Sequence, residues 1–355
     1  MSALIRVLVV DDSAFVRKVV TQMLSRSPFL DVVGAARDGE EAMEMVARLK
    51  PDVVTLDLVM PRVDGLEFLR RQMAIAPLPV VICSISHESG AAALEAFELG
   101  AVEFVQKPTA LATDRVYEIA DELIAKVKAA SEVKLSKAAL AFAADVASRS
   151  GHSEVVATQV PSRLALGAEI VVIGISTGGP QALRAFIPRL AATFPVPIAV
   201  VLHMPVGYTA MYAERLNDIS ELNVVETSEG DVIRAGAMYL APAGHHLTFV
   251  RDTEGIVRAH LDLRPLDTQH RPSVDVLFRS AAEVYNGRVL GVVMTGMGRD
   301  GLVGSAHIQA KGGRILTEAE SSCVVYGMPR AVVEAGVSDR VATLDEIPSA
   351  IMEMI

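Results

Sequence analysis

The N-terminal part of the chain alternates short apolar runs with longer segments in which apolar residues recur every three or four positions. The runs lack a polar face, which is typical of parallel strands covered on both sides. The segments between them have helical spacing. The expected strands cover 5–10, 31–35, 53–56, 80–84 and 102–105, and the expected helices cover 14–25, 39–49, 65–74, 90–100 and 113–128. This alternation predicts an α/β fold of the flavodoxin-like kind.

The same alternation starts again at Glu169 and predicts a second, doubly wound α/β domain. Its expected strands cover 170–175, 196–202, 289–294 and 314–316, and its expected helices cover 180–190, 209–216, 274–284 and 301–311. Between 224 and 261 the pattern is less regular and favours strands. We expect a first domain at 1–126, a partly helical linker at 127–167 and a second domain at 168–355. The length of 355 residues agrees with two domains of roughly 150 residues each.

Charge and composition narrow the possible partners. The formal net charge is −10, which argues against nucleic acid, because phosphate binding needs clustered Lys and Arg. The first residues lack the pattern of a signal peptide, and no apolar segment approaches the ~20 residues of a membrane span. The two cysteines suggest neither a zinc site nor a disulfide framework. We therefore expect a soluble, cytoplasmic protein that binds no nucleic acid and does not insert into membranes.

Polar residues follow four of the expected strands of the first domain. Asp11 and Asp12 follow the first strand, Asp57 the third, Ser84 ends the fourth, and Lys107 follows the fifth. The carboxyl ends of parallel strands meet at one edge of the sheet, so these side chains are expected to converge. Three carboxylates in one place favour Mg²⁺, and the ammonium and hydroxyl could bind phosphoryl oxygens. Taken singly, the aspartates could instead cap a helix or a turn, and the lysine could be a solvated loop charge.

Residues 4–125 resemble a two-component response-regulator receiver, and the stretch 56–65 (LDLVMPRVDG) resembles its phosphorylation-site signature. The resemblance implies that Asp57 is phosphorylated and that Asp11 and Asp12, with Asp57, hold Mg²⁺. It also implies a histidine kinase of the chemotaxis type as phosphodonor.

The same resemblance assigns the switch residues of the first domain. Ser84 and Lys107 would sense the phosphoryl group, and Phe104 would be the aromatic switch. The receiver family often has Tyr at this last position, and Phe lacks the hydroxyl.

A second motif, Gly174–Pro180, joins an expected strand to an expected helix and matches G-x-S-x-G around Ser176. Small residues allow a tight turn that exposes the hydroxyl, and the helix N-terminus beyond can stabilise an oxyanion. A phosphate-binding turn or a structural glycine turn would have the same pattern. His203 and Asp300 follow two other expected strands, so the fold could gather a Ser-His-Asp triad. Their chain order differs from that of the α/β-hydrolases.

The remaining histidines suggest no catalytic role. His245 and His246 could bind a metal, but adjacent residues of a strand point to opposite faces, which favours a structural or substrate-lining role. No partner can be argued from the sequence for the others, which are His87, His152, His260, His270 and His307.

Residues 169–345 resemble the catalytic domain of the chemotaxis protein-glutamate methylesterase family (CheB). The motifs are 174–180 (GISTGGP), 203–205 (HMP), 272–278 (PSVDVLF), 295–301 (TGMGRDG) and 322–329 (SCVVYGMP). The resemblance implies that Ser176 is the nucleophile, His203 the base and Asp300 the orienting acid. Thr177 and Met297 would shape the oxyanion site.

The residue directly before His203 departs from this family pattern. The family commonly has Gln where this chain has Leu202, which leaves two alternatives open, a change of activity or a change of packing alone.

The two resemblances together imply a phosphorylation-activated carboxylic ester hydrolase. It would demethylate glutamyl methyl esters of methyl-accepting chemoreceptors, deamidate their glutamines, and need no cofactor for the ester reaction. The unphosphorylated receiver would cover the esterase crevice. Two alternatives stay open: a phosphorylation-gated adaptor with an inactive hydrolase domain, and an esterase with another substrate.

Overall fold

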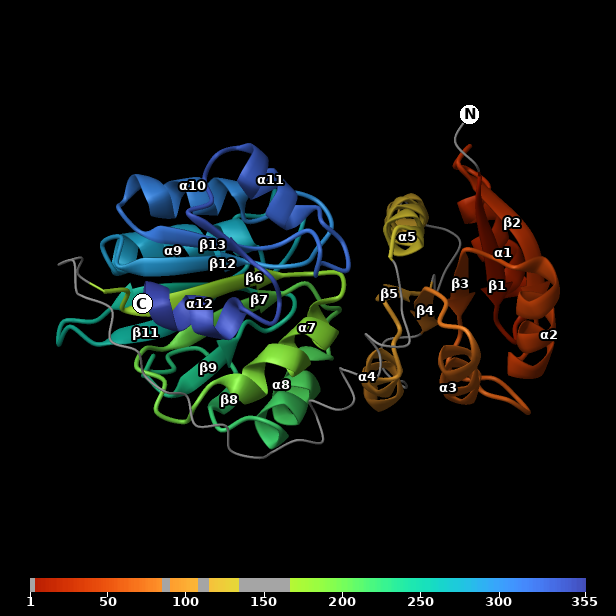
Figure 1. The fold of residues 1–355 in the computed structure, drawn as a ribbon, viewed down its shortest axis with the longest axis horizontal. Coiled ribbons are helices and arrows are strands. Elements are labelled where there is room, and N and C mark those ends of the chain that lie inside the picture. Colours follow the sequence, from red (N-terminus) through yellow and green to blue (C-terminus); the bar gives the residue numbers. More distant parts are fainter. Residues whose placement is uncertain (1–3, 85–89, 108–114, 134–166) are drawn as a thin grey trace. The chain divides into compact units, whose positions relative to one another are not determined.

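The structure, a computed structural model, describes residues 4–84, 90–107, 115–133 and 167–355. Contacts within the chain divide it into two units, Met1–Ala141 and Phe142–Ile355 (Figure 1). Each unit has its own parallel sheet. No helix within the described ranges is both long and apolar enough to cross a bilayer.

The first unit is a five-stranded sheet between helices. Its strands are β1 (Ile5–Val10), β2 (Leu30–Ala36), β3 (Val53–Leu56), β4 (Val80–Ser84) and β5 (Glu103–Gln106). Its helices are α1 (Ala14–Leu24), α2 (Gly39–Leu49), α3 (Gly65–Ile75), α4 (Gly90–Glu98) and α5 (Arg115–Ser131). The strand order is β2-β1-β3-β4-β5, and every pair is parallel. This confirms the predicted flavodoxin-like fold.

Local capping explains where three helices of this unit begin. The side chains of Ser13, Asp38 and Asp64 accept hydrogen bonds from backbone N–H groups in the first turns of α1, α2 and α3. Asp11 in turn accepts the N–H of Ser13 at 2.9 Å. Ser13 is therefore the cap of α1, and the two preceding aspartates are left for other roles.

The second unit is a larger doubly wound sheet. Its strands are β6 (Ile170–Ile175), β7 (Ile198–Leu202), β8 (Asn223–Glu226), β9 (Ala237–Leu240), β12 (Val289–Val293), β13 (Arg314–Glu318) and β14 (Arg340–Ala342), with a separate hairpin of β10 (His246–Arg251) and β11 (Val257–Asp262). Its helices are α7 (Gly179–Phe186), α8 (Thr209–Asp218), α9 (Val274–Val284), α10 (Leu302–Ala310), α11 (Met328–Glu334) and α12 (Ile347–Met354). The strand order is β14-β13-β12-β6-β7-β9-β8.

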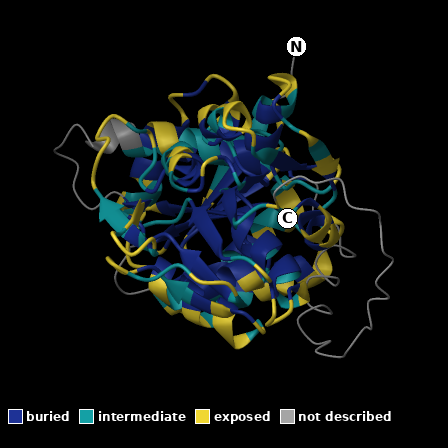
Figure 2. Cartoon of the chain, turned by 90° about the vertical axis from the view of Figure 1, so that its left-hand side faces the viewer, coloured by how far each residue is buried: buried dark blue, intermediate teal, exposed yellow. Residues whose placement is uncertain are grey.

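The order of the second sheet reverses beside β6, which has β7 on one side and β12 on the other. Helices α7 and α8 lie on one face of the sheet, and α9 and α10 on the opposite face (Figure 1). Figure 2 shows the strands buried and the exposed residues on the outer faces of helices and in loops. In such sheets the crevice beside the reversal, at the carboxyl ends of the strands, is where ligands bind.

Several described elements differ from the expected ones by a few residues at an end, and the larger differences are these. Helix α5 extends to Ser131, past both the expected helix end at 128 and the expected domain boundary at 126, and Ala129 and Ala130 in this last turn are buried. The expected helix 180–190 ends as an α-helix at Phe186 and continues as a short 3₁₀ turn. The pattern also missed α11, β14 and α12. Most of the expected linker lies outside the described residues, so the boundaries at 126 and 168 stay predictions.

Candidate phosphorylation site and active site

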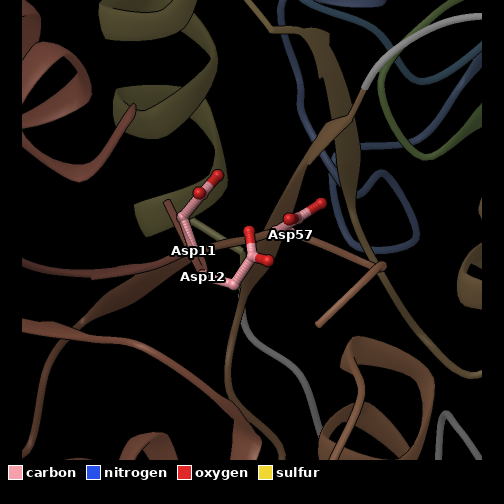
Figure 3. Close-up of side chains that lie close together, drawn as sticks. All are labelled: Asp11, Asp12 and Asp57. Carbon is pink, nitrogen blue, oxygen red and sulfur yellow. The ribbon is translucent and has the colours of Figure 1, made fainter. Parts of the chain in front are cut away.

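Three carboxylates converge at one edge of the first sheet. Asp11 and Asp12 follow β1, and Asp57 follows the neighbouring strand β3, whose register pairs Leu56 with Val10 (Figure 3). One oxygen from each carboxylate lies within 4.8 Å of the others. Asp11 and Asp57 are buried, whereas Asp12 is exposed. Three convergent oxygen donors fit a hard cation such as Mg²⁺, as the receiver pattern implies.

Lys107 holds two of these carboxylates. Its Nζ lies 2.7 Å from Oδ2 of Asp11 and 2.6 Å from Oδ2 of Asp57. Burial alone would lower the pKa of Lys107, but the hydrogen bonds to both aspartates raise it above its usual value. Burial raises the pKa of Asp57, although Lys107 acts in the opposite direction. One ammonium therefore only partly compensates the acidic cluster.

The other two expected switch residues lie on the adjacent strands. Ser84 ends β4 and is buried, and its backbone carbonyl accepts the N–H of Lys107 at 2.9 Å. Phe104 is buried on β5, and its carbonyl accepts a hydrogen bond from Lys126. The structure thus places Asp57, Ser84 and Lys107 at one edge of the sheet, with the aromatic ring turned into the interior.

In the second domain, Ser176 follows β6 directly and lies in a tight turn that leads into α7. The N–H of Gly179 closes the turn on the carbonyl of Ser176 at 2.7 Å. Gly178 has a φ of +76°, and a Cβ there would lie 2.4 Å from the side chain of Val324. This position therefore requires glycine both for its conformation and for space.

The register of the sheet brings His203 beside Ser176. Leu202 pairs with Ile175 in neighbouring strands, and the N–H of His203 donates to the carbonyl of Ile175 at 3.1 Å. The next residues along the two strands are therefore neighbours, about 4.8 Å apart in backbone position. Nδ1 of His203 is buried and has no hydrogen-bond partner among the described residues. Its other nitrogen, Nε2, lies 3.0 Å from Oδ2 of Asp300.

Asp300 has hydrogen-bond partners at both of its oxygens. Five groups lie within hydrogen-bond distance of its two oxygens: Nε2 of His203, Oγ of Ser273, and the backbone N–H groups of Val274, Asp275 and Gly301. Two of these N–H groups belong to the first turn of α9, where the helix dipole also favours a negative charge. Burial alone would raise the pKa of Asp300, but the hydrogen bonds from His203 and from this turn lower it to about 2. Asp300 is therefore a permanent anion at neutral pH.

A second carboxylate completes a reciprocal arrangement of two helices. Asp275, in the first turn of α9, accepts the N–H of Gly301 at 3.0 Å and that of Gly304 at 2.6 Å, at the start of α10. Asp300, just before α10, accepts N–H groups at the start of α9. Each helix thus supplies the cap of the other, which fixes where the acid lies relative to both helices.

The loop after β12, which contains Met297, passes against the turn that contains Ser176 and Thr177. A Cβ at Gly296 would lie 2.8 Å from Cβ of Ser176, so the loop passes directly against the turn. Oγ1 of Thr295 donates to the carbonyl of the buried Thr177 at 2.9 Å. Met297 follows in the same loop and is partly buried. Thr177 is thus the chain neighbour of Ser176, and Met297 follows the glycine that passes against the turn.

Sequence reasoning missed His270, which contacts His203, and gave His246 only a structural or substrate-lining role. The ring of His270 stacks on the ring of His203 with 4.0 Å between centroids. His246 is fully buried and accepts the N–H of Ser273, whereas its neighbour His245 is exposed. Only His246 lies in a strand, because β10 begins there and His245 lies in the bend before it, so the predicted alternation within a strand does not apply to this pair. No spacing in the sequence could have connected residues 203, 246 and 270, which come from different loops and strands.

The fold and these two polar edges define a two-domain α/β protein of the receiver-plus-hydrolase kind. The family model described as CheB methylesterase matches residues 171–351, and that of the response regulator receiver domain matches residues 7–116. A protein-glutamate methylesterase/protein-glutamine glutaminase of Myxococcus xanthus is 50% identical over 96% of this chain and 95% of its own length. One of Pyrococcus horikoshii is 40% identical over 100% of this chain and 95% of its own length.

A solved structure agrees with these matches. The CheB methylesterase catalytic domain of Thermotoga maritima is 40% identical, with a TM-score of 0.52, over 54% of this chain and all of that chain. The chain therefore belongs to the CheB methylesterase family, a family of carboxylic ester hydrolases, and carries a receiver domain ahead of the catalytic domain.

Proposed function

We propose that the protein is a phosphorylation-activated protein-glutamate methylesterase that acts on methyl-accepting chemoreceptors in sensory adaptation. The same site would deamidate glutamine, as the names of the relatives indicate for those proteins. The observation that most supports hydrolysis is the contact between His203 and an ionised Asp300, next to a serine in a glycine turn. An adaptor with an inactive hydrolase domain would have no need of this arrangement.

In the proposed reaction, Ser176 attacks the ester carbonyl while Nδ1 of His203 takes its proton. This nitrogen fits the role because the other one, Nε2, is engaged with Asp300. The ionised acid would stabilise the imidazolium that forms. Backbone N–H groups near Thr177 and Met297 would bind the oxyanion. Methanol would leave with the proton from the imidazolium, and water would then release glutamate by the same steps.

Control would come from Asp57. A histidine kinase of the chemotaxis type is proposed as the phosphodonor, and Mg²⁺ held by Asp11, Asp12 and Asp57 would neutralise charge on the incoming phosphoryl group. Lys107 lies 2.6 Å from Asp57 and is placed to bind a phosphoryl oxygen instead. Ser84 and Phe104 would respond to that change. We also propose a cytoplasmic location, where such kinases obtain phosphoryl groups from ATP.

The proposal is tested by methanol release from methylated chemoreceptor membranes, with Mg²⁺ and with or without a small phosphodonor. We expect release that depends on Ser176 and increases with the phosphodonor. No release from protein shown to be folded and phosphorylated would contradict the methylesterase proposal. Methanol release at the same rate with and without the phosphodonor would contradict only the proposed control by Asp57.

A further inference from the structure

His246 is not one of the proposed reacting groups, but it contacts both ends of a segment, residues 265–273, that touches two of them. At the start of this segment, Nε2 of His246 lies 3.2 Å from the carbonyl of Pro265 and 3.2 Å from Oγ1 of Thr268. At its end, the N–H of Ser273 lies 3.2 Å from Nδ1 of His246. A single buried ring therefore closes the segment 265–273 into a loop.

These contacts define the protonation state of the ring. A backbone N–H can only donate, so Nδ1 of His246 must be an unprotonated acceptor. A carbonyl can only accept, so Nε2 must carry the hydrogen that reaches Pro265. The arrangement is satisfied by one tautomer of the neutral imidazole, and a protonated ring would lose the contact with Ser273.

The segment that His246 closes touches both members of the acid–base pair. In its middle, the ring of His270 stacks on His203 at 4.0 Å. At its end, Oγ of Ser273 donates to Asp300 at 3.0 Å. The N–H of Gly244, close to His246 in the chain, also donates to this segment, at the carbonyl of Arg271.

We infer that His246 is a positioning residue, which as a neutral imidazole holds the segment 265–273 so that His203 and Asp300 keep their mutual geometry. This inference rests on the proposed esterase reaction. A displacement of about 1 Å at reacting groups can cost about 100-fold in rate. We therefore expect the kcat of His246→Ala to fall about 10- to 100-fold while KM changes less.

Two conservative variants of His246 test its contact with Ser273 and its contact with Pro265 separately. In His246→Asn the amide oxygen can replace Nδ1 as acceptor for Ser273, but nothing replaces Nε2. In His246→Gln the amide nitrogen can reach toward Pro265, but Ser273 loses its acceptor. Each is expected to recover part of the rate lost in His246→Ala. The matched control is His245→Asn, because the neighbouring ring is exposed, and its kcat should equal that of the wild type.

The pH profile adds a readout that a purely structural role would not change. Burial lowers the pKa of His246 from 6.5; Arg271 acts in the same direction, and Pro265, Asp300 and Asp262 oppose it. Below pH 6.5 the unfolded chain then binds more protons at His246 than the folded chain does. The free energy of unfolding therefore falls as the pH falls below 6.5. The acid limb of kcat/KM should be steeper in the wild type than in His246→Asn, which cannot titrate. Equal slopes would overturn the requirement for a neutral ring.

The inference can fail separately from the proposed function. Full activity of folded His246→Ala, with wild-type release dependent on Ser176, would overturn the inference alone. If the wild type releases no methanol, imidazole ¹⁵N NMR still tests the inference: we expect a neutral, Nε2-protonated His246 at pH 7, and a charged ring would contradict it. If His246→Ala does not fold, Ser273→Ala should lower kcat and Ser273→Thr should restore it; equal rates for both would contradict the inferred link to Asp300.

Discussion

In each domain the polar site residues lie at the carboxyl ends of parallel strands. The two sites differ in how many hydrogen-bond donors compensate the charge of each carboxylate. In the receiver, Asp11 and Asp57 share the single ammonium of Lys107, at 2.7 and 2.6 Å. In the catalytic domain, Asp300 alone has five donors around it. Both sites thus lie at the carboxyl edge of a doubly wound sheet, and they differ in how many donors surround each carboxylate.

The pKa values follow this difference. Burial raises the pKa of Asp57, whereas the hydrogen bonds of Asp300 overcome its burial and lower the pKa to about 2. A cluster of carboxylates whose charge is only partly compensated is stabilised when a cation binds. This suits a site such as that of Asp57, which is proposed to switch between unphosphorylated and phosphorylated forms. A saturated carboxylate is a fixed charge and suits a site that stabilises an imidazolium in every turnover.

The largest expected effect is that of Ser176→Ala. Without the nucleophile, kcat for methanol release should fall by about 10⁴-fold or more. The matched control is phosphorylation of Asp57 by a small phosphodonor, which should be unchanged because it uses the other domain. A folded Ser176→Ala protein with near wild-type turnover would show that another group attacks the ester.

The next largest expected effect on kcat is that of removing the negative charge of Asp300. Asp300→Asn keeps the shape of the side chain but removes the charge that orients and stabilises His203, so we expect kcat to fall about 10³- to 10⁴-fold. Asp57→Asn makes the same chemical change at the other edge and should leave unstimulated kcat within about twofold. Similar losses of basal rate for the two variants would contradict the division of roles between the two edges.

Removal of Mg²⁺ should affect only the receiver. With a chelator present, we expect the phosphodonor to lose its effect on methanol release, because Asp11, Asp12 and Asp57 would repel an incoming phosphoryl group. Basal release should stay the same, since the proposed ester reaction uses Ser176, His203 and Asp300. A fall in basal release on chelation, reversed by Mg²⁺, would contradict this separation.

The two carboxylates also predict stability effects of opposite sign. The pKa of Asp300 is lowered from 3.8 to about 2, so its stabilisation is present above pH 3.8 and is lost as the pH falls through 2. This shift corresponds to about 2 kcal/mol in the free energy of unfolding, which Asp300→Asn should remove at pH 7. The pKa of Asp57 is raised, so its ionisation destabilises the fold above that pKa, and Asp57→Asn should stabilise the protein at pH 7. Denaturant unfolding at pH 7 and pH 3 measures both differences, and equal signs at pH 7 would contradict the comparison.

The sequence predicted the strand ends well because strands buried on both faces leave a clear apolar run. Asp57, Ser176 and His203 were all found as polar residues directly after such runs. The donors around Asp300 could not be found in this way, because Ser273 and the first turn of α9 meet the acid only through the crossing of two helices. His270 was missed for a similar reason, since stacking on His203 depends on a loop without a periodic pattern.

The smallest expected effect sharpens the comparison at Leu202, where the family commonly has Gln. The side chain is fully buried on β7, and a Cβ at Gly179 in the first turn of α7 would lie 2.6 Å from its Cδ1. In Leu202→Gln a buried amide would need partners in an apolar setting, so we expect the free energy of unfolding to fall by about 1–3 kcal/mol. Leu202→Met conserves volume and should cost less than about 1.5 kcal/mol. If the Gln variant is as stable as the Met variant, the amide has found a partner, and the first turn of α7, which packs against this side chain at Gly179, is the nearest candidate. A change in kcat would then follow from that contact with the oxyanion turn, whereas a loss of stability with unchanged kcat would assign Leu202 to packing alone.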